Sequence, residues 1–346
     1  MSKIVFVLGA GASAESGAPL MSDFMYKAEK IYNNLDFNLD RNIYELVTKG
    51  QGILQNAIAK SAIDIYNIEH LFTAFEMASL FGRLGDLTQK EVSNLPHAMK
   101  RFIVDTIECS IAFPTVNGYL GPTDSYQKMA TYLQKLKNES YITNWSDISI
   151  ITFNYDLCIE IALTSLGIPF SYHITDSSKD KVSLFKLHGS FNWEYSVESG
   201  LKEKVSVTEI MRNLQPYNDS KKPLRLHTII GDPYIVPPSW NKLYYHEKLE
   251  RIWSEACKAF VDARNIIVLG YSFPPSDLLF QYLYAIGSMG VSVIKNFYYF
   301  DPSVQDLPKK LEPILGSSVL QRAKPMNLHF GRVFDTLETE HYLSQL

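Results

Sequence analysis

The sequence predicts an α/β fold, a doubly wound parallel sheet with a large helical insertion and a second, smaller insertion. Three observations support this prediction. Short apolar runs rich in β-branched and aromatic residues recur along the chain, as expected for strands covered on both faces. Segments with apolar residues at three- and four-residue spacing lie between them. Two long intervals contain no such run and are therefore expected to lie outside the sheet.

Five apolar runs are the expected strands of the sheet. In chain order they cover residues 4–8, 148–152, 183–187, 265–269 and 297–300. Each is too short for a typical helix and is bounded by turn-forming or polar residues. Polar or glycine residues follow directly after most of these runs, where ligands of open α/β sheets bind.

The two insertions are expected at about residues 25–145 and 195–242. The first is mostly helical, with apolar periodicity over residues 69–81 and 125–138. The second contains PYNDSKKP and VPPSW, which favour turns and loops, and residues 241–263 then read as an amphipathic helix. We therefore expect one domain over residues 1–346, with a Rossmann-like core at about 1–24, 146–194 and 243–346.

The composition excludes several classes of protein. Apolar residues make up 46% of the 346-residue chain, which is typical of a packed globular protein. The formal net charge of −4 gives no bulk electrostatic reason for nucleic-acid binding. The three cysteines are far apart, which favours a reducing compartment over a disulfide framework. No signal peptide or membrane span is recognisable, so we expect a cytoplasmic protein without membrane contact.

A glycine turn follows the first strand. Gly9-Ala10-Gly11 would let the backbone approach a phosphate closely, and the next helix would offer its N-terminal amides. This pattern indicates dinucleotide binding, although Ala14 replaces the third glycine of the usual fingerprint and no acidic residue follows at the expected distance. The alternative is a tight turn without a ligand.

Polar residues follow the other strands. Asn154 and Asp156 come just after the second strand, where they could bind a ribose or an amide. The alternative is a structural role for these two residues, in an Asx turn with a helix N-cap. His188 ends the third strand and could transfer a proton or be structural. After the last two strands, Gly270 would allow close approach of a phosphate bonded by Ser272, and Asp301 could bind a ribose or begin a turn.

Taken together, these motifs resemble the sirtuin superfamily, and most closely its prokaryotic sirtuin-like branch. The motifs occur in the order of that family: Gly9-Ala10-Gly11-Ala12-Ser13, Ser16-Gly17-Ala18-Pro19, Thr152-Phe153-Asn154-Tyr155-Asp156, His188-Gly189 and Gly270-Tyr271-Ser272. The resemblance implies an NAD site. The residues expected at its phosphates are Gly9, Ala10, Gly11, Ser13, Gly270 and Ser272. Those expected at the nicotinamide end are Asn154 (at the ribose), Asp156 and His188 (the catalytic histidine), with Asp301 at the adenosine end.

Departures from the family pattern suggest which activity to expect. Family deacylases carry a four-cysteine zinc module, but the span from Gly189 to Gly270 contains only Cys257. Pro19 is not followed by Phe-Arg, and Phe153 replaces the usual glutamine. We therefore expect an NAD+ hydrolase that needs no metal and serves antiviral (anti-phage) defence, as is common in this branch.

Two alternatives stay open: an NAD-dependent protein deacylase, and a non-catalytic module that senses NAD or ADP-ribose. Because constant NAD cleavage would poison a cell, we expect the activity to be gated. The resemblance suggests control by homo-oligomer formation, or by a partner such as an ATPase or a nucleic-acid-guided defence protein. The helical insertion could form a lid and part of an oligomer interface, or could simply pack on the sheet.

Overall fold

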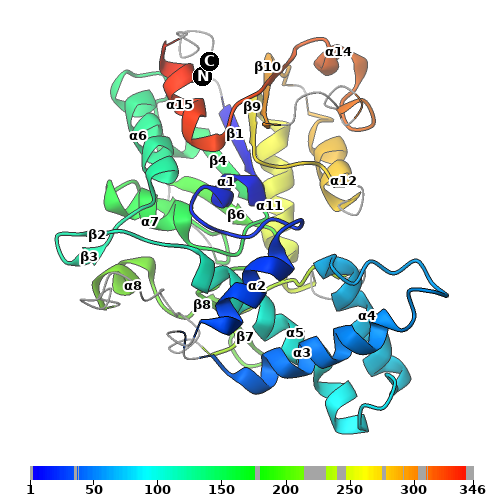
Figure 1. Ribbon diagram of the computed structural model, residues 1–346. Coiled ribbons are helices and arrows are strands. Elements are labelled where there is room, and N and C mark those ends of the chain that lie inside the picture. The colour runs from blue at the N-terminus through cyan, green and yellow to red at the C-terminus, as the bar shows by residue number, and fades with distance from the viewer. Residues whose placement is uncertain are drawn as a thin grey trace.

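The centre of the protein is a seven-stranded parallel sheet in the order β11-β10-β9-β1-β4-β6-β5, flanked by helices (Figure 1). The structure is a computed structural model that describes residues 3–34, 37, 39–175, 180–213, 231–239, 247–274, 278–290, 292–302, 309 and 311–339. From β1 the chain adds β4, then the edge strand β5, and then β6 between them; it returns to the other side of β1 with β9 and continues to β10 and β11. This reversal at β1 makes the sheet doubly wound and confirms the predicted fold class.

All five predicted strands are present. They are β1 (Lys3–Leu8), β4 (Ile148–Thr152), β6 (Val182–Lys186), β9 (Ala263–Leu269) and β10 (Asn296–Phe300). Both edge strands, β5 (Phe170–Ser171) and β11 (Ala323–Met326), were not predicted from the sequence. Neither contains a buried residue, because an edge strand is covered less than a central one. They therefore lack the apolar run that marks the other strands.

Four helices between β1 and β4 have a hydrophobic core of their own. They are α2 (Phe24–Asn33), α3 (Arg41–Gln55), α4 (Ile68–Phe81) and α5 (Gln89–Ser110). Phe75 of α4 and Leu95 of α5 are completely buried in this core. The four helices form a group at the bottom of Figure 1. The helix predicted for residues 69–81 is thus confirmed as α4, capped by the Asn67 side chain, which accepts hydrogen bonds from the amides of Glu69 and His70.

The next helix, α6 (Asp124–Asn138), packs on the sheet instead. Its residues Tyr126, Met129 and Leu133 belong to the same core as β1 and β4. This confirms the helix predicted for residues 125–138. Helix α15 (Phe330–Thr339) packs against α6, and the Phe330 ring lies 4.9 Å from that of Tyr126. In the part of the chain that the structure describes, no helix combines the length and apolar character needed to cross a membrane.

The remaining elements connect and cover these layers. Two antiparallel hairpins are formed by β2 (Thr115–Val116) with β3 (Tyr119–Leu120), and by β7 (Trp193–Ser196) with β8 (Gly200–Glu203). The other α-helices of the described residues are α1 (Ala10–Ala14), α7 (Cys158–Ser165), α8 (Val207–Asn213), α11 (Glu250–Val261), α12 (Leu278–Gly287) and α14 (Ser317–Leu320). Helix α11 confirms the second part of the helix predicted for residues 241–263, whose first six residues lie outside the described residues, as do 214–230 of the loop-rich insertion.

One row of paired residues crosses the sheet where six strands end. In spatial order it consists of Met326, Phe300, Leu269, Leu8, Thr152 and Lys186. Because the strands are parallel, the turns that follow this row all lie at the same edge of the sheet. Every residue predicted for the site lies in one of these turns or in the helix α1 that follows the first. The reversal of strand order at β1 is in the middle of this edge.

Candidate functional site at the carboxyl edge of the sheet

The turns after β1 and β9 are in close backbone contact. The amide of Gly9 donates to Leu269 O at 3.1 Å, and the amide of Gly11 donates to Gly270 O at 2.8 Å. A Cβ atom on Gly9 would lie 2.6 Å from Gly270 O, and one on Gly11 would lie 2.8 Å from the Gly270 Cα atom. Side chains are therefore excluded at both positions by the neighbouring turn.

Gly270 completes this contact. Its φ of +59° is in the left-handed region, and a Cβ atom there would lie only 2.2 Å from the Ala12 nitrogen. The close packing of the two turns thus explains why Gly9, Gly11 and Gly270 are glycines. The amides of Gly9 and Gly11 already have hydrogen-bond acceptors in the neighbouring turn. The predicted contact of the three glycines with a pyrophosphate, together with that of Ala10, stays a prediction.

The Asn154 carboxamide is held in one orientation. Its Nδ2 donates to Gly9 O at 2.9 Å and to Ser13 Oγ at 3.0 Å, so both amide hydrogens are used. These two partners assign the nitrogen and oxygen of the group, since Gly9 O can only accept. The half-buried Asn154 therefore keeps Oδ1 as its acceptor for another group.

A tyrosine from α6 extends this hydrogen-bond chain. The hydroxyl of Tyr126 lies 2.7 Å from Ser13 Oγ, and both side chains are buried. Burial raises the pKa of Tyr126 far above its usual value, so the hydroxyl stays neutral. Tyr126 was not predicted as a site residue, because nothing in the helical pattern around it distinguishes it from an ordinary core tyrosine.

Asp156 lies in the core at the start of α7. Its Oδ1 accepts a hydrogen bond of 3.0 Å from the amide of Cys158, which is the Asx turn considered from the sequence. Burial, and then the nearby Asp156 carboxylate, raises the pKa of the Cys158 thiol well above its usual value. This contact supports the structural alternative for Asp156, and a place near the nicotinamide stays a prediction.

His188 lies in the turn after β6, next to the turn that carries Asn154. Its ring packs edge-on against Phe153 at 5.1 Å and tilted against Tyr155 at 6.3 Å. Thr152 pairs with Lys186 in the sheet, so Asn154 and His188 each lie two residues beyond this pair. The structure thus brings the two predicted catalytic residues to neighbouring strand ends.

The stretch 231–239 runs beside the His188 turn. The amide of Val236 donates to His188 O at 2.8 Å, and the Tyr155 hydroxyl donates to Val236 O at 2.6 Å. Gly189 has a φ of +84°, and a Cβ atom there would lie 2.2 Å from Tyr234 O. This contact, which was not predicted from the sequence, joins the second insertion to the candidate site.

Ser272 and Asp301 differ in exposure. Ser272 is exposed to solvent, whereas Asp301 is buried and accepts a hydrogen bond of 3.2 Å from the Tyr299 hydroxyl. Burial, with the Asp301 charge, raises the pKa of Tyr299. The Tyr271 ring, next to Ser272 in the chain, stacks on the Phe153 ring with 4.6 Å between centroids. This apolar contact joins the turns after β4 and β9. Phosphate contact by Ser272 and ribose contact by Asp301 stay predictions.

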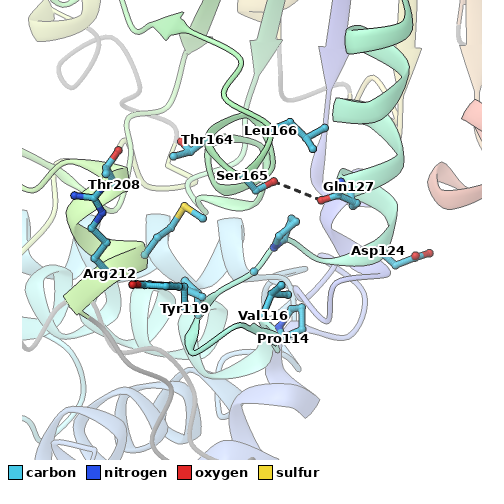
Figure 2. Close-up of a pocket in the computed structure, with 14 residues that line it drawn as sticks. Pro114, Val116, Tyr119, Asp124, Gln127, Thr164, Ser165, Leu166, Thr208 and Arg212 are labelled. Carbon is cyan, nitrogen blue, oxygen red and sulfur yellow. Dashed lines mark hydrogen bonds between the residues drawn. The ribbon is translucent and has the colours of Figure 1, made fainter.

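An open cavity of about 1020 Å³ lies away from these turns (Figure 2). It is formed by the β2–β3 hairpin, the start of α6, the end of α7 and α8, and its walls include Tyr119, Gln127, Ser165 and Arg212. Ser165 Oγ donates to Gln127 Oε1 at 3.4 Å across it. None of the residues predicted for the site lines this cavity, so it is separate from the candidate site.

No cluster of three histidine, cysteine, aspartate or glutamate side chains suited to a metal occurs among the described residues. Two histidines that could join Cys257 as zinc ligands, His227 and His246, lie outside the described residues. The expectation that the reaction needs no metal therefore depends on the sequence and stays a prediction.

Comparison with known proteins gives a family match over part of the chain. Residues 148–310 match the family model described as SIR2-like domain, a range that includes Asn154, His188 and Gly270. No curated protein matches the chain.

Solved structures similar to the chain include a Sir2 homolog–NAD complex, with 16% identity, a TM-score of 0.43, and coverage of 99% of this chain and 91% of that chain. Another is Sir2Tm bound to a propionylated peptide, with 16% identity, a TM-score of 0.40, and coverage of 98% and 93%.

Proposed function

We propose that the protein is a sirtuin-like NAD+ hydrolase, which cleaves the bond between nicotinamide and ribose to give nicotinamide and ADP-ribose. The observation that carries the proposal is the fixed carboxamide of Asn154, which keeps one oriented acceptor at the switch point of the sheet. The match of residues 148–310 to the SIR2-like domain supports a site for NAD in the same turns.

The chemistry needs few groups. Nicotinamide leaves with the bonding electron pair, and the ribose passes through a cationic, oxocarbenium-like state before water adds to C1′ and loses a proton. The Asn154 Oδ1 would accept a hydrogen bond from this water or from a ribose hydroxyl and would stabilise the positive charge. His188, at the neighbouring strand end, would orient the ribose or take up the proton. The stacked Phe153 and Tyr271 rings would keep bulk water out.

Protein deacylation is the second candidate, because the SIR2-like match does not separate it from hydrolysis. The hydrolase is favoured by the sequence between Gly189 and Gly270, where Cys257 is the only cysteine and a four-cysteine zinc module cannot form. It is also favoured by Phe153 at the position of the usual glutamine. A non-catalytic NAD or ADP-ribose sensor would use the Asn154 acceptor for a ribose hydroxyl alone, and product analysis separates it from the hydrolase.

The activity is expected to be regulated, because constant NAD cleavage would poison the cell. Contacts between the helical insertion and the stretch 231–239 support regulation through this insertion. Arg101 of α5 donates to Gly231 O at 3.3 Å and to Asp232 Oδ1 at 3.2 Å. Ser239 donates to Glu76 of α4. Both contacts hold the stretch 231–239 that lies beside His188. Homo-oligomer formation, or a partner ATPase or nucleic-acid-guided protein, would act by moving these helices in an anti-phage response.

Product analysis tests the proposal. Purified protein is incubated with NAD, with and without an acetylated peptide, over a series of protein concentrations, and the products are separated by mass spectrometry. We expect free ADP-ribose and nicotinamide in both mixtures, at a rate per chain that rises with concentration. Acetyl-ADP-ribose that forms only with the peptide would instead establish a deacylase. If neither free ADP-ribose nor acetyl-ADP-ribose forms at any protein concentration, catalysis by the chain alone is contradicted.

A further inference from the structure

We infer that Lys186 is a positioning residue for the proposed reaction: its buried ammonium group holds the backbone that directly follows Asn154. The catalytic part of this inference rests on the proposed function. Its structural part, that the ammonium fixes the turn between β4 and α7, does not. Lys186 is the last residue of β6 and was not anticipated as part of the site from the sequence.

The ammonium group has three acceptors. Its Nζ donates to Glu160 Oε1 at 2.6 Å, to Tyr155 O at 3.3 Å and to Asp156 O. Three acceptors match the three hydrogens of the group. The Lys186 and Glu160 side chains are both completely buried, at 0% exposure. Two of the three hydrogen bonds thus fix main-chain carbonyls of the Asn154 turn.

Stability alone does not account for this pair. Moving two charges out of water costs several kcal/mol for each ion, and an apolar pair of similar volume is often equally stable or more so. Burial raises the pKa of Glu160, while the Lys186 charge opposes that rise. The direction of this shift agrees with a carboxylate that has lost more water than its two partners, the Lys186 ammonium and the Tyr172 hydroxyl, replace. What the pair does provide is a fixed position for the carbonyls of Tyr155 and Asp156.

The turn is therefore held from two sides. On the β1 side, Asn154 Nδ2 donates to Gly9 O and Ser13 Oγ. On the β6 side, Lys186 holds the next two carbonyls, and the amide of Phe191 also donates to Tyr155 O at 3.1 Å. If the second side is released, the Asn154 carboxamide loses its fixed backbone. A displacement of about 1 Å at a reacting group can reduce turnover by about 100-fold.

The test removes both charges together. Lys186→Met/Glu160→Gln leaves no unpaired buried charge, so we expect it to fold. Its matched control is Tyr172→Phe, which removes the hydrogen bond of 3.2 Å from the Tyr172 hydroxyl to Glu160 but leaves both carbonyl contacts intact. The first measurement is hydrogen exchange of the amides of Asn154 and Cys158. We expect exchange at least about tenfold faster in the double variant and unchanged in the control.

The second measurement is steady-state cleavage of NAD. We expect kcat to fall by about tenfold or more in the double variant with KM within about threefold of wild type, because binding groups elsewhere are untouched. The rate is expressed per mole of folded protein, because a merely structural role would lower the melting temperature and the amount of active protein but would leave kcat per folded molecule and KM unchanged. A folded double variant with unchanged exchange and unchanged kcat would overturn the inference.

The two proposals fail in different ways. If the wild-type protein cleaves no NAD, the proposed function fails, while the exchange of the Asn154 turn still decides whether Lys186 holds it. If the double variant does not fold, Lys186→Gln/Glu160→Gln replaces it with the same expectations, because it keeps polar side chains in the buried space. Faster exchange with unchanged kcat would confirm the structural part and overturn the catalytic part.

Discussion

Asn154 and Ser13 are joined by a hydrogen bond of 3.0 Å from the carboxamide nitrogen of the first to the hydroxyl oxygen of the second. The bond connects the turn after β4 with the helix that follows β1, the strand at which the strand order reverses. Ser13 is bonded in turn to Tyr126 of α6. The Asn154 side chain is therefore oriented by a chain of contacts that reaches into the core.

Removal of the Tyr126 hydroxyl tests this chain of contacts. In Tyr126→Phe, Ser13 loses a buried partner, so we expect a loss of stability of about 1 kcal/mol and a fall in NAD turnover of about fivefold. Tyr132→Phe is the control, because Tyr132 lies on the same helix, is equally buried and packs on Phe334 instead. Equal kinetic effects of the two substitutions would show that the Ser13 contact does not matter for turnover.

Gly270→Ala tests the packing of the two glycine turns. The new Cβ atom would lie 2.2 Å from the Ala12 nitrogen, so the turns after β1 and β9 must separate. Gly167→Ala is matched to it, with a φ of +66° and no atom within 4 Å of the added Cβ. We expect the control to lose about 1 kcal/mol from the left-handed conformation alone. Gly270→Ala should lose clearly more stability than the control, as measured by urea unfolding. It should also lose NAD cleavage, as measured by the product assay.

Metal removal tests the expectation taken from the sequence. Dialysis against a chelator should leave NAD cleavage unchanged, and elemental analysis should find no stoichiometric zinc, because the chain lacks a four-cysteine module. Loss of activity that returns on adding zinc would contradict this expectation. Cys257 would then be the first ligand to test.

The central strands could be predicted from the sequence because both faces of each are covered, which requires nearly continuous apolar runs such as residues 265–269. Gly9 and Gly11 could be recognised as a special turn, although the sequence does not tell a phosphate contact from the contact with Gly270 that the structure contains. Asn154 and His188 could each be placed at the end of a predicted strand, and both lie at one edge of the sheet because parallel strands end there. That these two strands are neighbours is seen only in the structure.

Contacts between distant segments could not be predicted. Lys186 reads as a charged residue at the end of an apolar run, and only the fold shows that Glu160 and two carbonyls surround it. The stretch 231–239 likewise gave only a loop signal, since its partners at His188 and Arg101 lie far away in the sequence. Edge strand β11 was missed because its partial burial removes the apolar pattern.

The most direct test of the account is the rate of nicotinamide release from NAD by Asn154→Ala, compared with wild type at equal concentrations of folded protein. The control is Asn144→Ala, which changes an exposed asparagine near the opposite end of β4. Because Asn154 supplies the oriented acceptor, its loss should lower the rate by about 100-fold or more while the melting curve changes little. Asn144→Ala should cleave NAD like wild type. A well-folded Asn154→Ala protein that releases nicotinamide at the wild-type rate would contradict the account.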